Sequence, residues 1–178
     1  MEMDTRDNRY NPSDGGYYRI WNSTLEPLGE NTELTRLHRT GLKLQQILPL
    51  PGMGEPWLAW IRMQAENRSM ESGDPPRAEW IRFGGANTLR GHAERVFASS
   101  GVLTGSFELR RLLSRQSRVF ALLDAAVYRQ DSSSRGLWAW GGGVQLSVQQ
   151  GFLNVALAVP GGEGFSATTL HVSLSTAF

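Results

Sequence analysis

The sequence contains no cysteine, so disulfide scaffolds, thiolate zinc sites and cysteine nucleophiles are excluded. Lysine is nearly absent too: Lys43 is the only one, and almost all positive charge is carried by arginine. The net charge is +1, and no run of basic residues forms a patch. This composition argues against a nucleic-acid partner, because such proteins carry clustered positive charge.

Long hydrophobic runs are also missing. The longest, "LNVALAV" at residues 153–159, is far short of the ~20 apolar residues that a membrane-spanning helix needs. The opening "MEMDTRDNRYNPSDGG" is acidic and polar, which excludes a signal peptide in this stretch. Hydropathy leaves two classes open, a soluble protein or a membrane protein built from half-polar β-strands.

Side chains alternate between apolar and polar along most of the chain, which is the period of a β-strand. In "RVFALLDAAVY" one face carries only aliphatic residues, from Val119 to Val127, and the other carries Asp124. We predict an all-β antiparallel protein of eight strands, at Tyr17–Leu28, Glu33–Leu48, Trp57–Ser69, Val102–Leu112, Arg118–Tyr128, Leu137–Gln149, Phe152–Val159 and Phe165–Phe178. Their length of roughly 9–13 residues is typical of membrane-spanning strands rather than of soluble ones.

Tryptophan and tyrosine gather near the ends of these segments. The set comprises Tyr17, Tyr18, Trp57, Trp60, Trp80, Tyr128, Trp138 and Trp140. Such placement resembles the aromatic girdles of outer-membrane barrels, whereas in a soluble sandwich the same residues would be core.

Catalytic patterns are absent from the sequence. There is no GxSxG elbow, and His38, His92 and His171 have no convincing Asp or Ser partner order. We therefore expect neither enzymatic activity nor a cofactor or metal.

A long connection at residues 70–101 contains "FGGANTLRGH", which is not a phosphate-binding loop because it lacks GxxxxGK[ST] and GxGxxG. Together with "DTRDNRYNPSDGGYYRIWNS", "GSFELRRLLSRQSRVFALLDAAVY" and "LHVSLSTAF", it resembles the BamA/TamA-type outer-membrane assembly proteins, the bacterial surface antigen family. The family's GGxxxLRGY loop motif matches Gly84, Gly85, Leu89, Gly91 and His92, with His92 in place of the usual aromatic residue.

The resemblance implies a transmembrane β-barrel whose long loop folds back into the lumen. The loop arginine is Arg90, and its acidic partners on the wall would be Asp124 and Glu108. The alternation supports this pairing independently, because both carboxylates fall on the polar face of consecutive strands.

The final strand carries the remaining motif. In the family, alternating apolar residues and a terminal phenylalanine act as an assembly signal at the barrel seam, and here these are Leu170, Val172, Leu174 and Phe178. The implied location is the bacterial outer membrane, with lipid and unfolded outer-membrane or secreted polypeptides as partners.

Barrels of the family that this sequence resembles have sixteen strands, and this sequence supplies about eight. We expect residues 1–178 to be the C-terminal part of the barrel domain, without the POTRA repeats, signal peptide and first barrel half of the family. An open sheet edge in lipid leaves backbone groups unpaired, so further strands are needed. Two alternatives stay open: the barrel of a patatin-like or other outer-membrane protein, and a soluble lipid-binding β-barrel.

Overall fold

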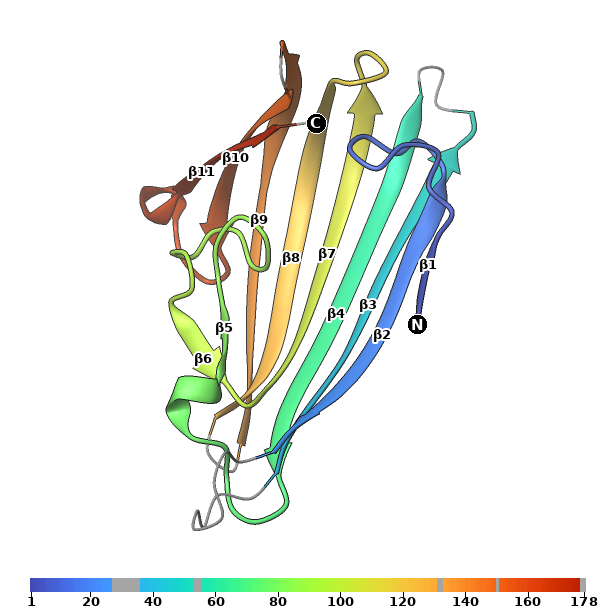
Figure 1. The fold of residues 1–178 in the computed structure, drawn as a ribbon. Coiled ribbons are helices and arrows are strands. Elements are labelled where there is room, and N and C mark those ends of the chain that lie inside the picture. The colour runs from blue at the N-terminus through green and yellow to red at the C-terminus, as the bar shows by residue number, and fades with distance from the viewer. Residues whose placement is uncertain (27–35, 53–55, 131–132, 150, 177–178) are drawn as a thin grey trace.

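The computed structural model describes residues 1–26, 36–52, 56–130, 133–149 and 151–176. Figure 1 shows an antiparallel sheet of long, tilted strands with one loop folded across a face. The sheet has nine strands in the order β1-β2-β3-β4-β7-β8-β9-β10-β11. Their bounds are Glu2–Asp4 (β1), Gly15–Leu25 (β2), Leu37–Leu50 (β3), Trp57–Met70 (β4), Gly101–Leu112 (β7), Arg118–Gln130 (β8), Ser133–Val148 (β9), Gly151–Pro160 (β10) and Thr169–Thr176 (β11).

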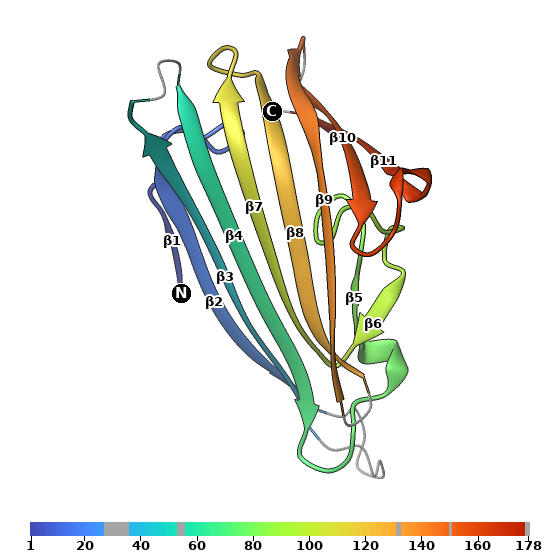
Figure 2. The ribbon, with the colours of Figure 1, turned by 180° about the vertical axis from the view of Figure 1, so that it is seen from behind.

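Each strand pairs with the next strand of the sheet along the chain, and β4 pairs with β7 across the long loop. The loop contains a 3₁₀ turn, η1 (Arg77–Glu79), and a small hairpin of β5 (Ile81–Phe83) and β6 (Phe97–Ser99). In Figure 2, the view from behind, this hairpin stands beside β9. Phe83 and Leu89 of the loop pack against Val102, Ala126 and Tyr128 of the sheet. The loop therefore covers one side of the sheet, which we term the loop face; the opposite side is the outer face.

Alternation along β8 confirms the predicted register. Asp124 is fully buried on the loop face, while Val119, Leu123 and Val127 on the outer face are 37%, 48% and 48% exposed. A register slip of one residue would have exchanged the two sets.

The main apolar cluster lies between the loop and the sheet. It comprises Ile81, Phe83, Leu89, Val102, Ala126 and Tyr128, with Phe97 and Leu137 packed against it. Strands β7 and β8 supply the floor of this cluster, and the loop supplies the lid. Burial of these side chains provides the non-directional part of the attraction between loop and wall.

The predicted fold class is correct, and several boundaries are wrong. The sheet has nine strands because Glu2–Asp4 adds β1 along the edge of β2. The last predicted strand begins too early, since Phe165–Ala167 forms a 3₁₀ turn, η2, and β11 begins at Thr169. The predicted ends at Leu28, Glu33 and Phe178 lie outside the described residues.

The aromatic girdle is also only partly present. Trp138 and Trp140 are exposed on the outer face, whereas Trp60 and Tyr128 are buried on the loop face. Trp60 is covered by the guanidinium groups of Arg62 and Arg110 at 5.2 and 4.3 Å from its ring. Proximity to a strand end therefore did not decide which way these rings point.

Candidate functional site

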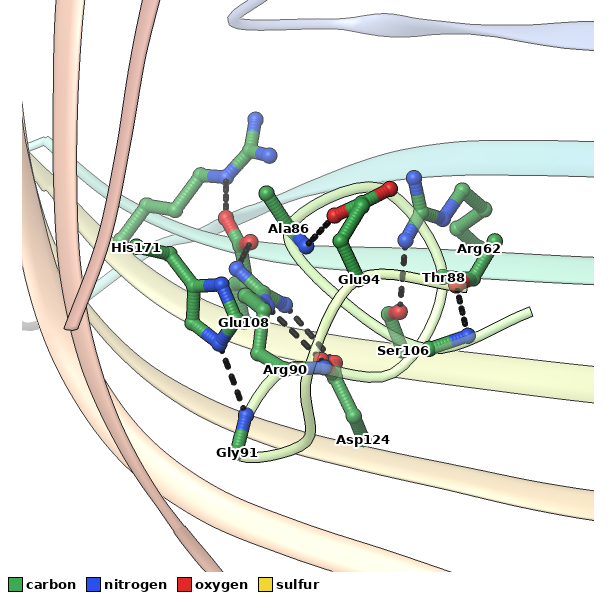
Figure 3. Close-up of polar contacts among 12 residues, drawn as sticks. Arg62, Ala86, Thr88, Arg90, Gly91, Glu94, Ser106, Glu108, Asp124 and His171 are labelled. Carbon is green, nitrogen blue, oxygen red and sulfur yellow. Dashed lines mark hydrogen bonds and ion pairs between the residues drawn. The ribbon is translucent and has the colours of Figure 1, made fainter. Parts of the chain in front are cut away.

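Arg90 is buried between the loop and the sheet, with its guanidinium between two carboxylates (Figure 3). Its Nε and Nη2 donate to the two oxygens of Asp124 at 2.7 Å each, and Nη1 donates to Glu108 Oε1 at 2.5 Å. Its backbone N–H also donates to Asp124 Oδ2 at 3.0 Å. The structure thus brings together the three residues that the sequence pointed to, and a planar two-pronged donor meets a carboxylate in its favoured geometry.

Register places the two carboxylates side by side. Asp124 of β8 is directly opposite Ser106 of β7, so Glu108 lies two positions further along the same face. The second oxygen of Glu108 accepts a hydrogen bond from Arg110 Nε at 2.8 Å. Buried charges need such partners, because an unpaired ion in the interior costs several kcal/mol.

Electrostatics keeps the Arg90 side chain ionised. Burial alone would lower its pKa, but the hydrogen bonds that it donates to Asp124 and the negative charge of Glu108 raise that pKa above the ordinary arginine value. The guanidinium is therefore charged at neutral pH.

Three glycines shape the loop around this arginine. Gly84, Gly85 and Gly91 have φ of 112°, 90° and 88°, which side-chain-bearing residues rarely adopt. Gly84 N–H donates to the Thr88 hydroxyl at 2.8 Å, and Gly85 and Leu89 form an antiparallel bridge.

Leu89 and His92 flank the Arg-Gly pair with different surroundings. Leu89 is fully buried in the apolar cluster and anchors the loop beside Arg90. The His92 ring meets the Phe97 ring edge-on, with centroids 5.2 Å apart. Burial lowers the pKa of His92, so its imidazole is neutral near pH 7 and packs as an aromatic ring would.

A second anchor holds the start of the loop. Glu79 of η1 accepts from Arg39 Nη2 at 2.6 Å and forms an ion pair with Arg68 at 3.6 Å. No sequence motif marks this cluster, because its three members come from three separate elements.

The final strand holds its motif residues on one face of β11. Leu170, Val172 and Leu174 are exposed, and Phe178 lies outside the described residues. The polar face carries two contacts that sequence reasoning missed. Gly91 N–H donates to His171 Nε2 at 3.0 Å, and the Thr169 hydroxyl donates to the Gly91 carbonyl at 3.1 Å. Alternation alone places Thr169 and His171 on this face, so the signal was present.

Within the described residues, no group of three or more His, Asp or Glu side chains is arranged to hold a metal ion. Across the same part of the chain, no helix is long and apolar enough to cross a membrane.

Comparison with known proteins yields a likeness of structure rather than of sequence. No family model matches the chain, and no curated protein sequence matches it. Among solved structures, BamA from Haemophilus ducreyi lacking POTRA domains 1–3 superposes with a TM-score of 0.79 over 99% of this chain, at 16% sequence identity. The chain has the fold of part of BamA. It spans 41% of that BamA chain, and its open antiparallel sheet is a partial barrel.

Proposed function

We propose that residues 1–178 form the C-terminal half of the barrel of an outer-membrane assembly or translocation protein, which inserts or transports β-barrel polypeptides without covalent chemistry. The fold likeness to BamA supports this reading, and so does the outer face of the sheet. The observation that carries it is the set of Arg90 contacts with Asp124 and Glu108, which hold a long loop against the loop face of a sheet whose outer face is apolar.

The outer face supports a lipid environment. Leu103, Phe107, Leu123, Val127 and Trp138 are 42–49% exposed on three adjacent strands, β7 to β9. Contiguous exposed apolar surface of this kind marks an interaction with lipid or protein. A soluble lipid-binding barrel would need the reverse arrangement, with a polar outside and an apolar inside. We therefore propose the bacterial outer membrane as the location and its lipid as one partner.

The loop face supports an interior that is filled by the protein's own chain. This face carries four buried charged residues, namely Arg90, Glu108, Arg110 and Asp124. A membrane protein tolerates buried charges only where other protein groups or water are in reach. Eight strands closed on themselves leave room for little more than their own side chains, so this loop needs a wider barrel. We propose that further strands complete that barrel, with POTRA repeats as additional partners.

Clients would engage the edge of the sheet. In the described residues β11 has a strand partner on one side only, and its free backbone groups can accept an added strand by β-augmentation. Unfolded outer-membrane or secreted polypeptides are the partners that such an edge fits.

The test is client folding in phospholipid vesicles that contain the protein. A urea-denatured outer-membrane β-barrel protein is added, and its folded fraction is followed by heat-modifiable gel migration. Vesicles with the protein should fold the client faster than empty vesicles, and Arg90→Ala should lose severalfold of that gain. Arg82→Ala, at an exposed position of β5, is the matched control and should keep it.

Two outcomes would overturn the proposal. One is client folding at the same rate in empty and protein-containing vesicles. The other is equal loss with Arg90→Ala and Arg82→Ala while both variants remain folded by their own heat-modifiable migration.

A further inference from the structure

The Arg90–Gly91 pair, which we term the clamp, contacts five consecutive strands. Arg90 binds Glu108 of β7 and Asp124 of β8. A Cβ built on Gly91 would lie 2.8 Å from the Ala139 Cβ of β9 and 3.3 Å from the Pro160 nitrogen of β10. Two residues of the loop thus reach every strand from the middle of the sheet to its edge.

The fifth strand is held through hydrogen bonds. The Gly91 backbone donates to His171 Nε2 at 3.0 Å and accepts from the Thr169 hydroxyl at 3.1 Å, as Figure 3 shows for His171. Among the described strands β11 pairs only with β10, and these two hydrogen bonds join it to the loop as well. Thr169 and His171 are 78 and 80 residues from Gly91 in the sequence. The two hydrogen bonds are therefore long-range contacts that fix the position of β11 relative to the loop.

The hydrogen bond between Gly91 N–H and His171 Nε2 depends on the protonation state of His171. Nε2 of a neutral imidazole can accept a hydrogen bond, whereas both ring nitrogens of the imidazolium are donors. A protonated His171 would present an N–H to the Gly91 N–H, and the bond would be replaced by a repulsive contact. The Thr169 bond would remain.

We propose that His171 positions the last strand by accepting the hydrogen bond of Gly91, and that its protonation releases β11 from the loop. On the proposed function, this release would free the edge that clients engage. The contact itself is a property of the fold and does not depend on that function.

Several ionisable groups act on this imidazole. Arg90, His92 and Glu94 belong to the loop, and Asp124 belongs to β8. Arginine stays cationic, and imidazole is the side chain whose ordinary pKa falls in the range between pH 5 and 8. His92, on the same loop tip, is therefore the rival source of a pH response among these groups, and the experiment must separate it from His171.

The absence of native cysteine allows a clean distance measurement. Nitroxide labels are placed through Asn87→Cys on the loop and Ser173→Cys on β11, both at exposed positions, with the full chain in lipid nanodiscs. Distance distributions are recorded by pulsed electron resonance at about pH 7.5 and about pH 5, the lower value lying well below the ordinary imidazole pKa of about 6.5. The wild-type background should give one narrow distribution at the higher pH and a broader, longer one at the lower pH.

Two substitutions of His171 give opposite expectations. His171→Gln keeps an acceptor oxygen that does not titrate, so the distribution should stay narrow at both pH values. His171→Ala removes the acceptor, so the distribution should be broad at both. His92→Phe and His38→Gln are the matched controls, and each should keep the wild-type response.

The proposal is overturned if the wild-type distance does not change with pH. It is also overturned if His171→Gln responds as the wild type does, or if His92→Phe abolishes the response. No client is present in this measurement, so its result is independent of the vesicle-folding test of the proposed function. Heat-modifiable migration of each labelled variant verifies that the barrel strands are folded.

Discussion

At the scale of single residues, the contact between loop and sheet depends on the planar, two-pronged shape of the Arg90 guanidinium. Three of the Arg90 nitrogens and its backbone N–H all donate to carboxylate oxygens, and these come from two strands. A lysine would bring the same charge but only a compact point donor on a flexible stem. The hydrogen-bond geometry therefore requires arginine at this position, whereas the charge alone would also allow lysine.

Arg90→Lys tests this distinction. The substitution keeps the positive charge near Asp124 and Glu108 but cannot reproduce the paired contact with Asp124. We expect it to lower the free energy of unfolding by about 1.5–3 kcal/mol, the typical value of one hydrogen bond to a charged group. Urea titration in detergent micelles, read by heat-modifiable migration, measures the change. Arg82→Lys should leave the midpoint unchanged, and a wild-type midpoint for Arg90→Lys would contradict the argument.

The clamp and the residues that it contacts differ in how visible they were in the sequence. Asp124 stood out because it interrupts an otherwise aliphatic segment, and Glu108 because it shares the polar face of the neighbouring strand. Gly91 bonds His171 through its backbone, and backbone donors leave no trace in side-chain patterns. The role of His171 as an acceptor is therefore visible only in the folded structure, although alternation placed it on the correct face.

At the scale of the elements, β8 shows why alternation predicted the sheet so well. Its two faces meet different surroundings, with buried Phe120, Leu122 and Asp124 on one side and exposed aliphatic residues on the other. Elements with few tertiary contacts were harder to predict. The three-residue β1 contributes too little pattern to recognise, and η2 lies in a segment whose apolar Phe165 imitates a strand start.

If lipid covers the outer face, a charge there should cost more at mid-strand than at a strand end. Leu123 lies near the middle of β8 and Val119 near its beginning, and both point outward. We expect Leu123→Arg to destabilise the protein by about 2–4 kcal/mol and Val119→Arg by about 0–1 kcal/mol, following the depth dependence in membrane barrels. Urea unfolding in phospholipid vesicles measures both. Equal costs for the two variants would mean that water, rather than lipid, covers this face.

At the scale of the whole molecule, the open sheet sets the remaining problem. The sheet is bounded by β1 and β11 in the described residues. Strand β1 pairs with Tyr17–Arg19 of β2, and its flanking residues add backbone hydrogen bonds only at Gly16 and Ile20. Unpaired backbone groups at such edges are costly in hydrocarbon. The eight long strands alternate in direction, so β2 and β11 run antiparallel and an even number of added strands can close the barrel with every pair antiparallel.

Hydrogen exchange can detect the two edges directly. In a chain of these 178 residues in detergent micelles, amides of β7 and β8 have strand partners on both sides and the loop packed on one face. Peptides from β11 and from Trp21–Leu25 of β2 have a strand partner on one side only. We expect the edge peptides to exchange at least about tenfold faster than those of β7 and β8, since exchange reports local opening.

The opposite result has an equally definite meaning. Protection of both edges equal to that of β8 would require β2 and β11 to be paired, either with each other or with another chain. Pairing with each other would force the loop out of the interior, because an eight-stranded barrel is filled by its own side chains. The Arg90 contacts with Asp124 and Glu108 would then be lost, and the loop peptide 84–97 would exchange as fast as free chain. Slow exchange in both the edges and the loop would instead indicate a second copy or further strands at the edges. Fast edges together with a protected loop are the pattern that we expect for half of a wider barrel.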